Sequence, residues 1–151
     1  SWSSWPLVWF DGAGSVLGAE SPEAAAAGYR QQIDARKAVR SPVSMRATGG
    51  AGSGSVTVTV KVREALATSS NVLRIAVIED DVIAAAHEFD FVARDLLDDE
   101  PLTVSAVGDS AVVTRTVTAD PSWNVSKLSV IAFVQDDLTK EVLQSVRAET
   151  R

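Results

Sequence analysis

The sequence contains no cysteine and only one histidine, His87. The first absence excludes disulfide bonds, thiolate nucleophiles, cysteine-ligated zinc and iron–sulfur clusters within the chain. The second excludes a metal site with two histidine ligands, and we expect no histidine-based triad. We therefore expect neither a cofactor nor a metal ion, and no enzyme active site in this chain.

Basic residues and long apolar runs are also scarce. The 14 lysines and arginines are outnumbered by 20 acidic residues, which gives a net charge of −6. The basic residues are scattered apart from Arg36, Lys37 and Arg40, whereas recognition of nucleic-acid phosphates requires clustered cations. No apolar run approaches the roughly 18 residues of a membrane span, and the first residues lack the pattern of an intact signal peptide. We expect no nucleic-acid partner and no membrane-spanning segment.

Residues 1–40 predict a hairpin followed by a helix. The apolar run Trp5–Phe10 ends at Asp11-Gly12, which is typical of a buried strand that closes in a tight turn. Residues 16–18 can return as a second strand. Ser21-Pro22 is a helix start signal, and the alanine-rich segment that follows predicts a helix over 22–38. Ser41-Pro42 ends this helix and sets the domain boundary near residue 41.

Residues 41–151 predict an antiparallel β-sandwich, immunoglobulin-like or jelly-roll-like, so that the chain is mainly β. The clearest strand is Ser55–Val62, where Val56, Val58, Val60 and Val62 alternate with polar residues and should face a core. Phe91–Leu97 is ambiguous between strand and helix, and 139–146 can be a strand or a short helix. Further extended runs, separated by turn residues, occur at 43–48, 73–78, 102–107, 111–118 and 127–135.

The order proline, strand, Asp-Gly turn, strand and helix in residues 1–40 resembles the C-terminal half of a thioredoxin fold. In that family a proline, usually cis, opens a strand beside the redox centre, and Pro6 matches it. Residues 42–151, through 73–80, 91–97, Trp123-Asn124 and 130–144, resemble the β-sandwich that follows a thioredoxin-like domain in bacterial outer-membrane-associated and secreted proteins. The resemblance implies an extracytoplasmic bacterial protein.

The same resemblance implies an upstream half of the thioredoxin unit that often carries Cys-x-x-Cys. Thiol–disulfide exchange needs a thiolate, so this chain supplies at most one wall of a redox site. A half sheet leaves an unpaired edge and an uncovered apolar face, which are aggregation hazards unless something covers them. We therefore expect residues 1–40 to pack against the sandwich, a protein partner or a second copy.

The candidate interaction surface consists of Trp5, Pro6, Trp9 and Trp123. Trp5 and Trp9 share strand parity and could form one aromatic face. Packing across the domain junction is the favoured interpretation, and stacking on a sugar ring is the weaker alternative.

Two further groups have a catalytic or metal-binding interpretation beside a structural one. His87 with Glu88 and Asp90 could form an acid–base pair, although a solvent-facing loop or short helical turn is favoured. The acidic runs 79–81, 98–100 and 136–137 could ligate calcium, but they lack EF-hand spacing and fit turn formation better.

From these observations we expect a non-catalytic extracytoplasmic module for protein interaction or surface attachment. The alternative is a fragment of a thiol–disulfide oxidoreductase or redox chaperone whose Cys-x-x-Cys half lies upstream.

Overall fold

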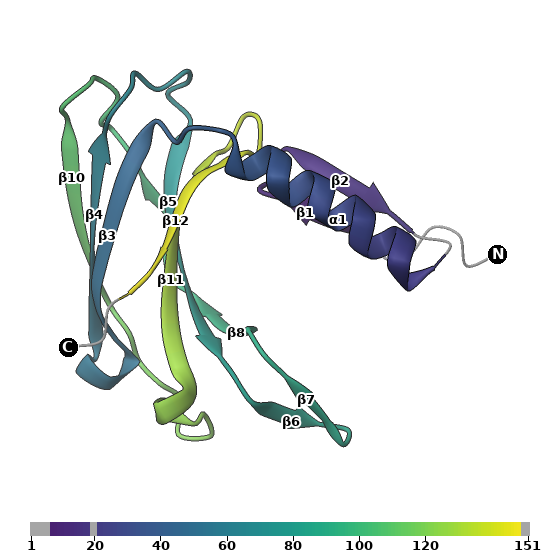
Figure 1. Cartoon of the computed structure of the whole chain (residues 1–151). Coiled ribbons are helices and arrows are strands. Elements are labelled where there is room, and N and C mark those ends of the chain that lie inside the picture. The colour runs from purple at the N-terminus through teal and green to yellow at the C-terminus, as the bar shows by residue number, and fades with distance from the viewer. Residues whose placement is uncertain (1–6, 19–20, 149–151) are drawn as a thin grey trace.

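The computed structural model describes residues 7–18 and 21–148, in which a hairpin and a helix precede an antiparallel β-sandwich (Figure 1). This confirms the mainly β fold class predicted from the sequence. The elements are β1 (Leu7–Phe10), β2 (Gly14–Leu17), α1 (Pro22–Lys37), β3 (Val43–Gly50), β4 (Ser55–Val62), β5 (Asn71–Glu79), β6 (Val82–Ala84), β7 (His87–Phe89), β8 (Val92–Leu96), β9 (Glu100–Pro101), β10 (Ser110–Thr116), β11 (Leu128–Asp136) and β12 (Val142–Arg147), with short 3-10 turns at Ala51–Ser53 and Val125–Lys127.

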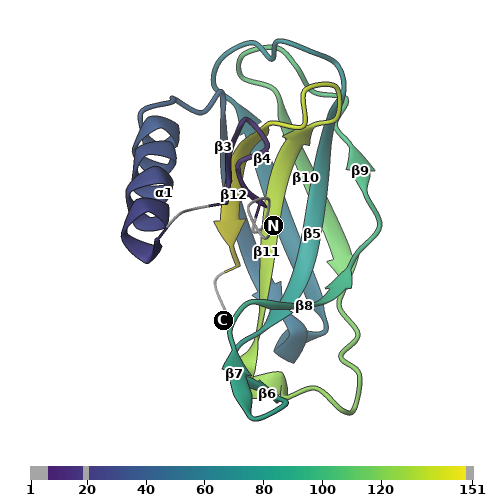
Figure 2. The same cartoon turned by 90° about the vertical axis from the view of Figure 1, so that its right-hand side faces the viewer.

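The sandwich consists of a three-stranded and a five-stranded sheet. The first has the order β10-β4-β3, and the second has the order β12-β11-β5-β8 with β9 on the same edge of β5 as β8. The chain crosses between the sheets after β4, β9 and β10, which gives an immunoglobulin-like arrangement of three strands against four, extended by the short β9. β12 lies beside β3 where the two sheets meet (Figure 2).

The core is a single apolar layer between the sheets. The predicted alternation of β4 is confirmed, since Val56, Val58, Val60 and Val62 are all buried. β5 and β11 face them with the same period of two, because alternate side chains of a strand point to one face. The other buried apolar residues of this layer are Val43, Ala47, Leu73, Ile75, Val77, Leu102, Val113, Val117, Leu128, Val130, Ala132 and Val134.

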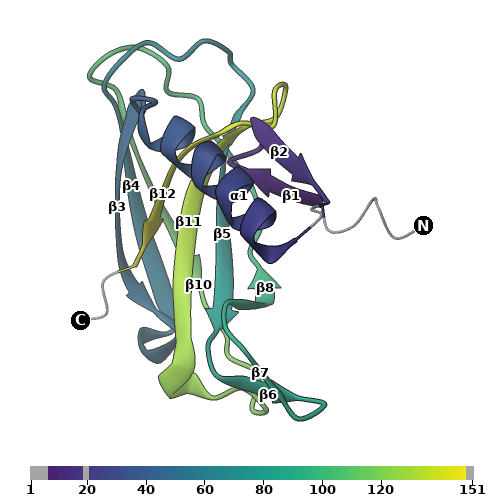
Figure 3. The same cartoon turned by 45° about the vertical axis from the view of Figure 1, so that its right-hand side comes forward.

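The hairpin β1–β2 and helix α1 form the N-terminal unit, residues 7–18 and 21–37. The helix begins where predicted because the Ser21 hydroxyl accepts a hydrogen bond from the amide of Ala24 at 3.2 Å. It runs along the hairpin (Figure 3), where Tyr29 contacts Phe10 with ring centroids 5.8 Å apart. Gly28 of the helix faces Val16 of the hairpin.

Two predictions about the sandwich are wrong. Residues 102–107 are not a strand: Leu102 is buried, but its amide donates to the carbonyl of Asn71 and the chain then runs irregularly. The loop or helical turn predicted around His87 is the strand β7, which pairs with β6 as a hairpin, although this segment does face solvent as predicted. We call residues 80–91 the arm. The ambiguous segment 91–97 contains β8, and most of β12 lies in the ambiguous segment 139–146, so both are strands.

Leu73→Ala should lower the free energy of unfolding by about 2–5 kcal/mol, because Leu73 is fully buried and truncation leaves a cavity. Urea denaturation would measure the change. The matched control is Leu138→Ala, whose side chain is 73% exposed and which should shift stability by no more than about 0.5 kcal/mol. Equal effects of the two variants would contradict the assigned core.

Candidate functional site

The face of the β1–β2 hairpin that points away from α1 is apolar and open. Leu7 pairs with Leu17 in the antiparallel register, and Trp9 follows two residues along the same face. Trp9 is 60% exposed, Leu17 is 59% exposed and Leu7 is also exposed. We call these three residues the outer face. Among the described residues, β1 pairs only with β2, so its other edge has unpaired backbone groups.

Beside this face, the hairpin and α1 form an open recess of about 380 Å³. Its apolar lining comes from Trp9, Phe10 and Ile33. Lys37 stands exposed at its rim, one helical turn after Ile33. The other polar lining residues are Asp11 and Arg36, which pair with each other, so Lys37 supplies the positive charge at the rim. An apolar recess beside this lysine suits an apolar side chain next to a carboxylate, because burial and ion pairing then act together.

Arg36 fastens the N-terminal unit to the sandwich. Its guanidinium Nε donates to Asp11 Oδ2 at 3.2 Å, and Nη2 lies 2.8 Å from Glu141 in the loop between β11 and β12. Burial tends to lower the pKa of Arg36, but the two carboxylates outweigh it and the pKa is raised. The amide of Val142 also donates to the carbonyl of Asp11 at 2.7 Å. These contacts orient the outer face relative to the sandwich.

Gly12 allows this close approach. Its φ is +68°, and a Cβ built there would lie 1.8 Å from the carbonyl oxygen of Lys140. Asp11, with φ of 49°, completes the predicted tight turn. The Asp-Gly pair therefore serves both the hairpin turn and the contact with the sandwich.

Of the four predicted surface residues, the structure places Trp9 on the outer face. Trp5 and Pro6 lie outside the described residues. The pairing of Trp5 with Trp9 therefore stays a prediction. Trp123 is half-buried against the sandwich core. Trp123 precedes β11, whereas the N-terminal unit that contains Trp9 contacts the loop after β11. Trp9 and Trp123 therefore lie at opposite ends of a strand about 26 Å long. The structure does not bring Trp123 to the surface formed by Trp9.

Sequence reasoning missed Ile33 and Lys37 as lining residues of the recess. Their spacing of four along a helix was a signal that they share a face. The local sequence does not indicate which side of the hairpin this helix face contacts.

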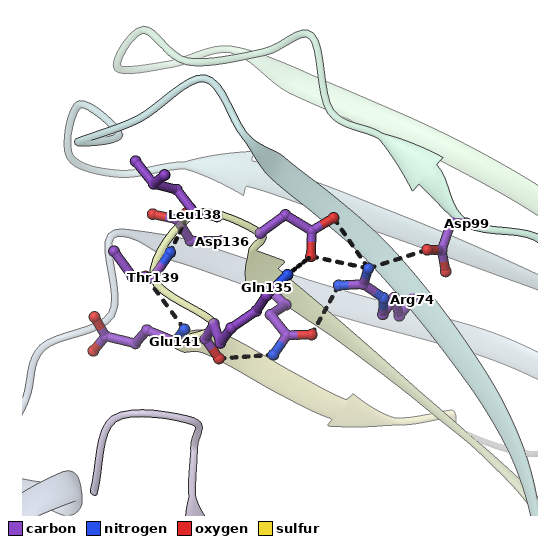
Figure 4. Close-up of polar contacts among 9 residues, drawn as sticks. Arg74, Asp99, Gln135, Asp136, Leu138, Thr139 and Glu141 are labelled. Atoms are coloured by element: carbon purple, nitrogen blue, oxygen red, sulfur yellow. Dashed lines mark hydrogen bonds and ion pairs between the residues drawn. The ribbon is translucent and has the colours of Figure 1, made fainter.

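The acidic turn at 136–137 has a structural role (Figure 4). Asp136 accepts hydrogen bonds from the amides of Leu138 and Thr139 at 2.8 and 3.4 Å. Asp137 pairs with Arg74 at 3.0 Å, and Arg74 also lies 3.1 Å from Asp99 and donates to Gln135. These carboxylates are engaged with donors of the protein.

The carboxylates of the acidic run at 79–81 also bind donors of the protein. Buried Glu79 pairs with Arg94 at 2.6 Å and accepts from the amide of Asn124 at 3.0 Å. Asp80 pairs with Arg147 at 3.1 Å, and Asp81 pairs with Lys127. Over 7–18 and 21–148, no group of three or more His, Asp or Glu side chains is placed to hold a metal ion.

The predicted acid–base group is exposed. His87 and Glu88 belong to β7 and Asp90 follows it, and all three side chains face solvent. His87 stacks edge-on against Phe89 with centroids 6.4 Å apart. An exposed group lacks the burial that tunes a catalytic acid or base.

No protein-family model matches the chain, and no curated protein matches it. A solved structure that is similar is a domain of the outer membrane lipoprotein Omp28 from Porphyromonas gingivalis. The TM-score is 0.48 and the sequence identity is 19%, over 75% of this chain and 91% of that chain. Within the described part of this chain, no helix is long and apolar enough to cross a membrane.

Gly12→Ala should separate the N-terminal unit from the β11–β12 loop, since the added methyl group collides with the carbonyl of Lys140. Amide exchange at Val142 should accelerate about tenfold, as expected for the loss of one hydrogen bond. Hydrogen exchange followed by NMR would measure it. Gly52→Ala is the control, because a Cβ at Gly52 meets nothing within 4 Å. Unchanged exchange at Val142 in Gly12→Ala would disprove the contact.

Stability should fall as the pH drops below about 4, the ordinary range of an aspartate pKa. Burial tends to raise the pKa of Asp136, but hydrogen bonds from Leu138, Thr68 and Thr139 outweigh it and lower the pKa. A carboxyl whose folded pKa is depressed stabilises the protein above its unfolded pKa, and this contribution is lost as the pH falls through the folded value. Urea midpoints between pH 7 and pH 2 should therefore decline less in Asp136→Asn than in the unmodified protein. Asp98→Asn, at an exposed loop position, is the matched control for removal of one carboxylate.

Proposed function

We propose that this chain is a non-catalytic extracytoplasmic module that binds protein through the outer face and recess of its N-terminal unit. The observation that supports this most directly is the exposure of Trp9, Leu7 and Leu17 on one side of a two-stranded sheet. Exposed contiguous apolar groups mark interaction surfaces, and tryptophan is enriched among residues that dominate binding energy.

The partner that fits is an extended polypeptide segment with apolar and acidic side chains. An extended segment can pair with the open edge of β1, as in strand addition. Its apolar side chains then lie over Trp9 and Ile33. Its carboxylates meet Lys37 and Arg30, both exposed on α1.

Titration calorimetry with a panel of short peptides tests this function. A peptide that alternates apolar and acidic residues should bind, and its counterpart with lysine in place of the acidic residues should bind at least about tenfold more weakly. Trp9→Ala should weaken binding by a similar factor, while Val112→Ala, an exposed position on β10, should not. Failure of all peptides, or equal binding to Trp9→Ala, would refute the function; a response to a glycan panel instead would favour the sugar-binding alternative.

The extracytoplasmic location is part of the proposal. It is supported by the resemblance of residues 42–151 to sandwiches of bacterial outer-membrane-associated and secreted proteins. Cell fractionation of the source bacterium, with an antibody against the sandwich, tests it. Recovery from the cytoplasmic fraction alone would refute it.

A second candidate is a portion of a thiol–disulfide oxidoreductase or redox chaperone. The observation that favours it is the order β1, β2 and α1, with the helix on one face of the hairpin and the other face open. Under this alternative the outer face is covered by an upstream Cys-x-x-Cys segment. Comparing the encoded sequence of the full gene with this chain decides between the two, because this alternative requires a Cys-x-x-Cys pair upstream.

A further inference from the structure

The arm, residues 80–91, is the second exposed apolar feature of the molecule. It extends the β5–β8 connection away from the sandwich as the β6–β7 hairpin (Figure 1). Ile83 is 78% exposed, Phe91 is 63% exposed and Phe89 is 47% exposed. In the described part of the chain, β6 and β7 pair only with each other, so each has an open edge.

The arm is held in one direction. Four of the six non-glycine residues with positive φ in the described chain belong to it: Asp81, Ala85, Ala86 and Phe91. At its base, Asp80 accepts from the amide of Phe91 at 3.0 Å, and Asp90 accepts from the amide of Asp81 at 3.2 Å. The ion pairs from Arg147 and Lys127 fix the same base to β12 and the start of β11. Strained backbone kept in place by such contacts is typical of functional segments.

The arm is rich in acidic residues, and the end of α1 that borders the recess, with the segment after it, is rich in basic residues. Residues 80–91 include four carboxylates and no lysine or arginine, whereas residues 30–40 include four basic residues and one aspartate. At the base of the arm, Asp80 and Asp81 form ion pairs with Arg147 and Lys127. Glu88, near the tip, is exposed to solvent. The arm therefore has the acidic and apolar character that the recess requires.

The positions of the two features permit a closed pair. Both project from the side of the five-stranded sheet, at opposite ends of the sandwich (Figure 1). A two-fold rotation about an axis perpendicular to the long axis of the sandwich brings two such sides together and exchanges the ends, so each arm meets the N-terminal unit of the other copy. The two contacts are then identical, as closed dimers require.

We propose that a second copy of this chain is the partner of the recess, with each arm of a two-fold dimer seated against the outer face and recess of the other copy. The inference rests on the proposed function, because it names the occupant of the same site. Ile83 lies against Trp9 and Ile33, and Glu88, which pairs with Ile83 on the same face of the arm, lies at the rim formed by Lys37. An open edge of the arm adds to the open edge of β1.

Sedimentation of the full chain over a concentration series tests the dimer. We expect dimers to form below about 100 µM, within the range of small specific interfaces. Ile83→Asp and Trp9→Asp should each weaken association at least about tenfold, and both positions are exposed, so folding is retained. Val112→Asp is the matched control on an exposed surface of the other sheet. A monomer throughout would overturn the dimer, and equal weakening by Val112→Asp would overturn the assigned interface.

Charge reversal tests the pairing of arm with recess. Lys37→Glu and Glu88→Lys should each weaken the homodimer, because two like charges then face each other in both contacts. An equimolar mixture of the two variants should recover dimers, since one contact is doubly reversed and the other is unmodified. No recovery in the mixture would overturn this pairing even if a dimer exists.

The outcome also separates this inference from the proposed function. If acidic–apolar peptides bind in a Trp9-dependent way while the chain sediments as a monomer, the function stands and the second copy is not the partner. If neither peptides nor copies bind, both fail.

Discussion

The structure depends on one apolar layer between two sheets. β4, β5 and β11 each place every second side chain in this layer, and most of those side chains are valine, isoleucine or leucine. β-branched side chains suit a pleated, buried surface, and their removal from water is the main favourable contribution to folding. The loops at both ends of the sandwich are positioned by this layer, and both exposed apolar features are attached to those loops.

The attachment of the N-terminal unit follows different physics. α1 buries no residue fully, and the unit meets the sandwich through Arg36, the carbonyl of Asp11 and the close approach at Gly12. Polar contacts at partly exposed positions contribute little stability but fix geometry. The outer face is therefore held in a defined orientation while it remains open. Pre-organisation of this kind lowers the cost of binding.

Acidic residues show how position decides the role of one residue type. Asp136 caps a turn, Glu79 is buried with Arg94, and Asp80 secures the base of the arm. Each is paired with donors of the protein. Near the arm tip, Glu88 is exposed to solvent. Many of the carboxylates in the described part of the chain are thus engaged by donors of the protein, including those at the base of the arm.

The sequence by itself determined the elements that are defined by a local repeat of apolar residues or by a local start or turn signal. The alternation in 55–62, the Ser21-Pro22 helix start and the Asp11-Gly12 turn predicted β4, α1 and the first hairpin. Only the tertiary structure decided that 80–91 forms an arm, because its strands are three residues long and its turn is Ala85-Ala86, without glycine or asparagine. It also decided that Trp9 is exposed while Trp123 packs on the core, and that Ile33 and Lys37 line a recess. Tertiary contacts between distant segments make these assignments, and no local pattern encodes which face of a hairpin is left uncovered.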